Sequence, residues 1–303
     1  MIELYDIAYV RSGTADAGEA VRFATEVVGM EYMGAEHGVH YLRADRRHHC
    51  LAFIEGESGV LSSGLSVADE AALRRAEEEL TLSGVTVQRG TAEEARSRRV
   101  GGFISFDDPW GNRFDLVYDQ VMDGRAVEYS RRAGIREFGH LCVDAPDVRA
   151  AFEWWSSLFN LQISDWVGDG AALMRFDEVH HKFAVFKGEK PGLCHINFQV
   201  ESLDDLMRSW RFLERENVEI EMGPGRHPTS TAIFIYFKGP EGLTYEYSFG
   251  VQLITDDSWV ARHFDPTVSA SIDMWGGPIQ RVSTQGQAPQ EPLVPGAPEL
   301  QGV

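Results

Sequence analysis

Polar and apolar side chains alternate in several short segments, most clearly in residues 193–200 and 244–249. A β-strand sends successive side chains to opposite faces. In the first of these segments, one face carries His195, Asn197 and Gln199, and the other carries Cys and apolar side chains. The apolar face can pack on a helix, so the polar face must meet water or line a cavity.

Alternation and helical spacing together predict the order of elements in the second half of the chain. Strands are predicted at residues 137–143, 162–167, 171–176, 181–187, 193–200, 218–221, 232–237 and 244–249. One helix is predicted over residues 145–159, with Asp144 or Asp147 as its N-cap. A second is predicted from Ser202 to about residue 217, where Ser202 and Asp205 form a start similar to a capping box. This order gives two β-α-β-β-β modules.

The first half of the chain repeats this pattern. His49 lies in a segment similar to that around His181, at an offset of 132, and Asp115 matches Glu246 at an offset of 131. An offset of 132 also aligns Ala8 with His140. Near-equal offsets along the chain indicate a duplicated domain. We therefore predict an α+β fold of two tandem domains, each built from paired β-α-β-β-β modules.

The composition of the chain indicates where a disordered tail begins and which classes of binding partner are disfavoured. We expect domains at residues 1–125 and 132–277, and a disordered tail at residues 278–303, which are rich in Pro, Gln and Gly. The formal net charge of -19 disfavours binding to nucleic acid. No apolar run is long enough to span a membrane, and the N-terminus does not resemble a secretory signal. Three cysteines without CxxC spacing fit a cytoplasmic location.

Three of the predicted strands each place a metal-binding group on a polar face: His140, His195 and Glu246. Two imidazoles and one carboxylate that leave coordination positions open are the ligand set of non-haem Fe(II) oxygenases. A single His on a strand is more often a surface or hydrogen-bonded residue. The three together indicate a metal site only if the fold brings them to one point.

Several motifs resemble those of the type I extradiol dioxygenases of the vicinal oxygen chelate superfamily, over roughly residues 1–277. Residues 225–228 (GRHP), 234–237 (FIYF), 239–242 (GPEG) and 245–247 (YEY) resemble the family's GRH…FY…PSG…EY signature. Residues 139–143 (GHLCV) and 193–198 (LCHINF) resemble the segments that hold its two His ligands. The Glu at position 241, where Ser is more usual, is interpreted as a turn variant.

The resemblance implies a vicinal oxygen chelate fold and a site in the second half only. His140, His195 and Glu246 would bind Fe(II), with Mn(II) as the alternative because both ions accept this ligand set. The first half has Ala8, Ser62 and Asp115 at the corresponding positions, so it would not bind a metal. The resemblance also implies catalytic roles for three more residues, which are His181, His227 and Tyr236.

His181 is preferred over its neighbour His180 as the catalytic His. The face of His181 also carries Phe183 and Val185, which indicates the interior, whereas the face of His180 carries Lys182, which indicates solvent. His181 would act as a base, and His227 and Tyr236 would hydrogen-bond the substrate oxygens.

The activity that the resemblance implies is extradiol (meta) ring cleavage of a catechol-type substrate with O2, in the catabolism of aromatic hydrocarbons, by a homo-oligomeric enzyme. The sequence does not distinguish monocyclic from bicyclic catechols. One alternative is another metal-dependent enzyme of the superfamily, of the glyoxalase or epimerase type. A second alternative is a metal-free protein of the same fold that binds a small molecule.

Overall fold

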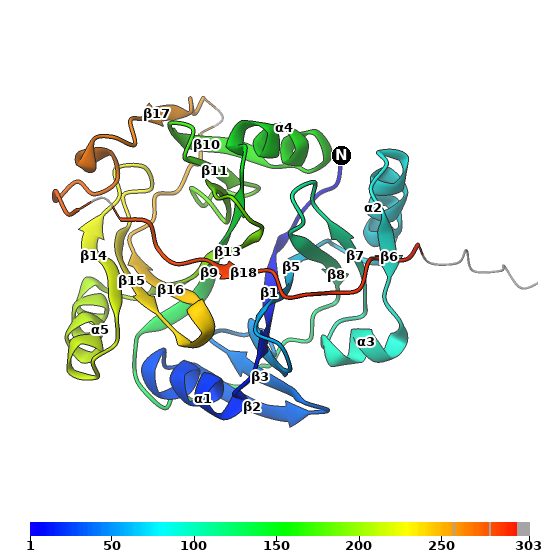
Figure 1. The fold of residues 1–303 in the computed structure, drawn as a ribbon, viewed down its shortest axis with the longest axis horizontal. Coiled ribbons are helices and arrows are strands. Elements are labelled where there is room, and N and C mark those ends of the chain that lie inside the picture. The colour runs from blue at the N-terminus through cyan, green and yellow to red at the C-terminus, as the bar shows by residue number, and fades with distance from the viewer. Residues whose placement is uncertain (257, 279, 296–303) are drawn as a thin grey trace, which may run out of the picture.

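The computed structural model describes residues 1–256, 258–278 and 280–295, and it arranges them as two similar halves side by side (Figure 1). Each half contains one curved sheet with helices on its outside. Residues 119–134 connect the two sheets. The predicted α+β fold of paired β-α-β-β-β modules is confirmed.

The first half contains an eight-stranded sheet in the order β2-β3-β4-β1-β5-β8-β7-β6. Its elements are β1 (Asp6–Thr14), α1 (Ala17–Arg22), η1 (Phe23–Val27), β2 (Glu31–Glu36), β3 (Val39–Arg43), β4 (Leu51–Glu55), β5 (Gly59–Ser66), α2 (Glu70–Leu82), β6 (Val87–Arg89), α3 (Ala92–Ser97), β7 (Gly102–Asp107) and β8 (Arg113–Tyr118). Strands β1 and β5 pair antiparallel, and this pairing joins the two modules into one sheet.

The second half contains a ten-stranded sheet in which β14-β15-β16-β13-β9-β12-β11-β10-β17 follow one another and β18 pairs with β13. Its elements are β9 (Ile135–Ala145), α4 (Val148–Leu158), β10 (Gln162–Val167), β11 (Ala171–Arg175), β12 (Phe183–Lys187), β13 (Gly192–Val200), α5 (Leu203–Arg215), β14 (Ile220–Arg226), β15 (Ile233–Lys238), η2 (Pro240–Gly242), β16 (Thr244–Phe249), β17 (Arg262–Phe264), η3 (Ser269–Ser271) and β18 (Gln285–Gly286). Here β9 and β13 form the joining pair.

Helices α4 and α5 each begin directly after a residue whose side chain caps the first turn. Asp147, and not Asp144, caps α4, because its carboxylate accepts the backbone N–H of Ala150. Ser202 caps α5 by accepting the backbone N–H of Asp205. Each helix then packs its apolar face against the sheet, which leaves the opposite face of the sheet free to enclose a cavity.

Aromatic side chains join the two halves into one continuous core. Trp155 on α4 is fully buried, and its ring centroid lies 4.7 Å from that of Phe114 in the first sheet and 4.7 Å from that of Phe183 in the second. Such pairs contribute about 0.5–1.5 kcal/mol each beyond the area they bury. The halves are therefore held in a fixed relation.

The C-terminal segment differs from the disorder predicted for residues 278–303. Residues 280–295 run from the second half across to the first (Figure 1). Gln285 pairs with β13, and the side chains of Gln287 and Gln290 donate to the backbone oxygen of Leu61. A segment poor in apolar residues can thus be fixed by hydrogen bonds to a scaffold that is already folded. Residues 279 and 296–303 lie outside the described residues.

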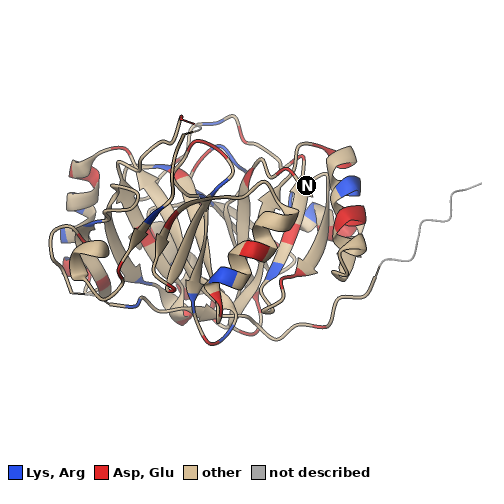
Figure 2. Cartoon of the chain, turned by 90° about the horizontal axis from the view of Figure 1, so that it is seen from above, with Lys and Arg blue, Asp and Glu red and all other residues tan. Residues whose placement is uncertain are grey.

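The helices and loops of both halves carry side chains of both charge signs (Figure 2). Among the described residues, no helix combines the length and the apolar character needed to cross a membrane.

Candidate metal centre

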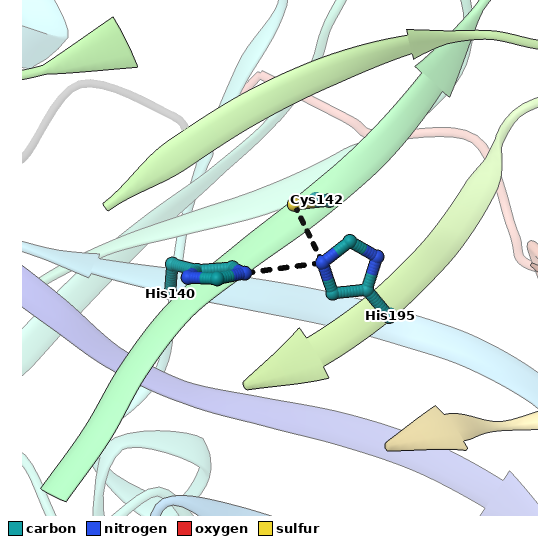
Figure 3. A group of neighbouring side chains, drawn as sticks. All are labelled: His140, Cys142 and His195. Carbon is teal, nitrogen blue, oxygen red and sulfur yellow. Dashed lines mark hydrogen bonds between the residues drawn. The ribbon is translucent and has the colours of Figure 1, made fainter. Parts of the chain in front are cut away.

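Three side chains from neighbouring strands of the second sheet converge on one point. Strand β13 lies between β9 and β16, and its residue Asn197 pairs with both His140 of β9 and Glu246 of β16. His140 Nε2 and His195 Nε2 lie 3.1 Å apart (Figure 3). Glu246 Oε2 lies 2.9 Å from the first of these nitrogens and 3.4 Å from the second.

This arrangement fits a divalent ion. Neighbouring ligands of an octahedral ion at roughly 2.1 Å lie about 3.0 Å apart, which matches the three distances between the donor atoms. Glu246 Oε2 is buried and has no hydrogen-bond partner among the described residues, although both imidazoles are close. A buried carboxylate oxygen without a donor is costly unless a cation compensates it. Two imidazoles and a carboxylate are also the donor set of mononuclear iron sites.

The protonation states of these residues suit metal binding. Burial alone would raise the pKa of Glu246, but His140 and His195 outweigh it and hold that pKa well below its ordinary value. Burial lowers the pKa of His140. An ionised carboxylate and a neutral imidazole are the forms that bind metals.

Cys142 is a fourth group near this point, with its Sγ 3.2 Å from His195 Nε2 (Figure 3). Its side chain is fully buried. Burial raises the pKa of its thiol well above the ordinary value, which disfavours the thiolate that binds metals. Glu246, whose Oε2 lies near both imidazoles, is the better third donor.

His181 lies beside the three donors, with its ring centroid 4.4 Å from that of His140. Its Nδ1 lies 3.1 Å from Nδ1 of His180, whose Nε2 lies 2.9 Å from Oδ2 of Asp165. The expectation that His180 faces solvent is wrong, because this side chain is fully buried. Strand β12 begins only at Phe183, so alternation does not extend back to the two His residues.

Two further predicted residues, His227 and Tyr236, form a hydrogen-bonded pair. His227 Nδ1 lies 2.8 Å from the carbonyl oxygen of Ile272, so this nitrogen carries the proton. Its Nε2 therefore accepts a hydrogen bond from the Tyr236 hydroxyl at 3.1 Å. The rings of Tyr236 and His195 meet edge to face with their centroids 5.0 Å apart, which places the pair at the same site.

A cavity of about 540 Å³ opens onto these side chains. His181, His195, His227 and Tyr236 line it beside the metal donors. Most of its remaining lining is apolar, including Leu173, Phe186, Met222, Ile272 and Val282, and Lys187, Glu189 and Arg281 add charged side chains. A planar molecule with polar atoms at one end would match this distribution.

Sequence reasoning did not find three groups that support the site. Asp165 and Arg262 form an ion pair that holds His180, and the carbonyl of Ile272 orients His227. Asp165 lies in a strand pattern that does not distinguish it from other buried polar residues. Ile272 contributes only its backbone, which no sequence pattern marks.

The first half carries a different set of residues at the corresponding positions. Ser62 and Asp115 lie there as predicted, because Asp115 pairs with Gly64 of β5 as Glu246 pairs with Asn197 of β13. The third residue is Tyr9 and not Ala8. Tyr9 pairs with Gly64 just as His140 pairs with Asn197.

Comparison with known proteins is consistent with this duplication. The sequence model of the Glyoxalase/Bleomycin resistance protein/Dioxygenase superfamily matches the chain twice, at residues 6–116 and 137–247. An iron-dependent extradiol dioxygenase of Rhodococcus jostii strain RHA1 is 27% identical, covering 91% of this chain and 97% of that protein. A 3-methylcatechol 2,3-dioxygenase of Pseudomonas putida is 28% identical, covering 90% and 97%.

A solved structure agrees over nearly the whole chain. The homoprotocatechuate 2,3-dioxygenase of Arthrobacter globiformis superimposes with a TM-score of 0.85, at 21% identity, covering 97% of each chain. At this level of identity the likeness establishes a shared fold, including the pairing of the two halves.

Proposed function

Because the chain belongs to the Glyoxalase/Bleomycin resistance protein/Dioxygenase superfamily, we propose that it is an extradiol dioxygenase that cleaves a catechol-type ring with O2 at a mononuclear Fe(II) site. The observation that carries this proposal is the convergence of His140, His195 and Glu246 beneath a cavity, with one carboxylate oxygen left without a donor. The relatives with extradiol activity cover almost the full length of the chain.

His140, His195 and Glu246 would hold the ion, and they leave its cavity side open. When bound, the ion supplies Lewis acidity that lowers the pKa of a catechol hydroxyl and brings the diol and O2 within reach of each other. Mn(II) is the alternative ion, since it accepts the same ligand set.

His181 is the proposed base, and its neighbours fix its tautomer. Burial lowers the pKa of His180, so this imidazole is neutral, and its Nε2 donates to Asp165. Its Nδ1 then accepts from Nδ1–H of His181. Burial also holds the pKa of His181 well below its ordinary value. His181 Nε2 is thereby left unprotonated, and it can take a proton from the substrate or return one to the oxygen that develops charge.

Tyr236 and His227 form a second route for a proton. The Tyr236 hydroxyl donates to His227 Nε2, so its oxygen is free to accept a hydrogen bond from a catechol hydroxyl. Transfer of the catechol proton to Tyr236 can accompany transfer of the Tyr236 proton to His227. Burial lowers the pKa of His227, which keeps that imidazole neutral and able to accept.

The shape of the cavity supports a substrate with an apolar body. Its volume of about 540 Å³ lies within the usual range for small-molecule pockets, roughly 300–1,000 Å³. The apolar end would hold the aromatic ring and its substituents, while the polar end would receive the diol. Water would be displaced from the reacting oxygens when the substrate fills the cavity.

The decisive experiment is anaerobic purification followed by metal analysis and addition of catechol with O2. We expect about one iron per chain, uptake of O2 and a yellow ring-fission product. Tightly bound metal without O2 uptake on a panel of substituted catechols would instead indicate an isomerase or epimerase. Absence of metal would indicate a binding protein of the same fold.

Two variants test whether His195 binds the metal ion. His195→Ala should lose both iron and turnover, whereas His263→Ala should keep both, because His263 is exposed on β17. Retention of full activity by the His195 variant would exclude the proposed site. A loss of iron in both variants would point to general unfolding, which circular dichroism would detect.

A further inference from the structure

The first half contains a cavity of its own, of about 290 Å³, at the place that corresponds to the catalytic cavity. Ser62 and Ser105 line it, and they correspond to His195 and Tyr236 of the second half. Arg11 also lines it and corresponds to Cys142, since Arg11 pairs with Ser62 as Cys142 pairs with His195. The duplicated fold has therefore kept a hollow but changed its chemistry.

Three arginines surround this cavity, and two of them already have partners. Arg98 donates to Asp115 at 2.8 Å, and Arg113 donates to Asp107 at 2.8 Å. Arg11 makes no hydrogen bond or ion pair with any described residue, and its Nε is buried. Burial, followed by the nearby Arg98, lowers the pKa of Arg11 from its ordinary value, while the charge of Asp115 acts to raise it.

Two glutamates also line the cavity, and in the described part of the chain neither accepts a hydrogen bond from Arg11. Glu94 is engaged in a capping box at the start of α3, where it accepts from the backbone N–H and the hydroxyl of Thr91. Glu291 contributes its backbone oxygen, which accepts from Arg113 at 3.3 Å. The half-buried Arg11 side chain therefore keeps free N–H donors at the cavity, and a carboxylate can accept from them.

We propose that this cavity binds a small organic monocarboxylate, whose carboxylate pairs with the Arg11 guanidinium. A planar guanidinium fork matches a carboxylate with two parallel hydrogen bonds. The side chains of Leu61, Phe103 and Leu293 add apolar wall for a short carbon body, and Ser62, Ser105 and Gln88 add hydrogen-bonding groups.

The C-terminal segment forms one wall of this cavity. Residues 290–293 line it, and the Gln290 side chain accepts from Arg113 at 2.8 Å and donates to the Leu61 carbonyl at 2.7 Å. The same segment forms β18 against Gly192 and Leu193, next to Cys194 and His195 in the second half. A ligand held under residues 290–293 would thus contact the segment that also touches the catalytic strand.

The test is isothermal titration of the purified, metal-loaded protein with sodium benzoate, a planar monocarboxylate. We expect binding in the native protein and in Arg132→Met, because Arg132 is exposed. Arg11→Met should bind at least roughly tenfold more weakly, as loss of a charge-assisted hydrogen bond implies. Inorganic phosphate, titrated in parallel, should bind more weakly than benzoate.

The outcomes decide the proposal. Failure of the native protein to bind benzoate would overturn it, as would unchanged binding in Arg11→Met, which would place benzoate in the catalytic cavity. Tighter binding of phosphate than of benzoate would overturn the assignment to a carboxylate. If Arg11→Met does not fold, Arg11→Lys serves, since it keeps the charge and loses the fork. Weaker binding there supports the proposal, and equal binding contradicts it.

Discussion

Asp115 in the first half and Glu246 in the second occupy corresponding positions on β8 and β16, and both carboxylates are buried. Asp115 is fully hydrogen-bonded within the protein. Its Oδ2 accepts from Tyr9, Ser62 and Arg98 at 3.0, 2.8 and 2.8 Å, and its Oδ1 accepts from Ser105 at 2.6 Å. Glu246 Oε2, by contrast, has no hydrogen-bond partner among the described residues.

The difference lies in the source of the compensating cation. An ionised carboxylate can be buried only if a positive charge and hydrogen-bond donors replace its water. In the first half the Arg98 guanidinium supplies that charge from within the chain. In the second half two imidazoles face the carboxylate, and no lysine or arginine of the described residues pairs with it, so a bound cation would supply the charge. Corresponding positions of the same fold thus hold a closed ion pair in one half and the proposed open metal site in the other.

The largest effects should come from removing the two carboxylates. Glu246→Gln should abolish iron retention and turnover without destabilising the metal-free protein. Asp115→Asn should keep iron but lower the free energy of unfolding by about 3–5 kcal/mol, because it leaves Arg98 buried without its partner. Iron analysis and urea unfolding of the metal-free forms measure both effects.

Asp169→Asn is the matched control, since Asp169 is exposed and should change stability by no more than about 0.5 kcal/mol. Equal destabilisation of the metal-free protein by the Asp115 and Glu246 variants would contradict the contrast between the halves.

The next largest effect concerns the paired histidines. His181→Phe should retain iron and reduce kcat by roughly 10²–10⁴-fold, the usual contribution of a positioned acid–base group. His49→Phe, the corresponding change in the first half, should leave kcat unchanged, because His49 stacks on Tyr9 away from the metal site. Steady-state O2 uptake measures both. Loss of iron in His181→Phe would show that this residue supports the ligands and not the reaction.

Much of the fold could be predicted from the sequence because period-2 alternation and helix caps are local properties. The predicted and observed strands coincide at residues 162–167 and 244–249. The C-terminal segment could not be predicted, because its order depends on hydrogen bonds to Leu61 and β13, which are distant in the sequence.

For the site, the identity of the converging residues could be predicted, but their environment could not. The residue that corresponds to His140 in the first half was assigned as Ala8 because an offset of 132 aligns these two residues. Strand pairing corrects this assignment, since a bulge separates Ile7 from Tyr9 in the register. His180 was assigned to solvent because it shares a face with Lys182, and its partner Asp165 lies on another strand, where the sequence does not mark it.

A smaller effect is expected from the hydroxyls at corresponding positions of β15 and β7. Tyr236→Phe should lower kcat by roughly 10–100-fold, a range typical for groups that support a metal site, since it removes the hydrogen bond to His227. Ser105→Ala should leave kcat unchanged and lower the free energy of unfolding by about 1 kcal/mol, because Asp115 loses one of its donors. If Ser105→Ala alters kcat as much as Tyr236→Phe does, the halves are not functionally separate.

The smallest expected effect is the pH dependence of the contribution that Asp115 makes to the free energy of unfolding. Burial raises the pKa of Asp115, but Arg98, Arg11 and the hydrogen bonds from Arg98 and Ser105 outweigh it and hold that pKa below its ordinary value. The pKa of this carboxylate is lower in the folded than in the unfolded protein, where it is about 3.9. Its ionised form therefore stabilises the folded protein to the full extent at pH values above the unfolded pKa. Its contribution falls as the pH drops through the folded pKa. The difference in unfolding free energy between native protein and Asp115→Asn should therefore be constant above about pH 5 and shrink below about pH 4. Urea unfolding across this range tests the point, and a difference that grew on acidification would mean that Asp115 is protonated in the folded protein.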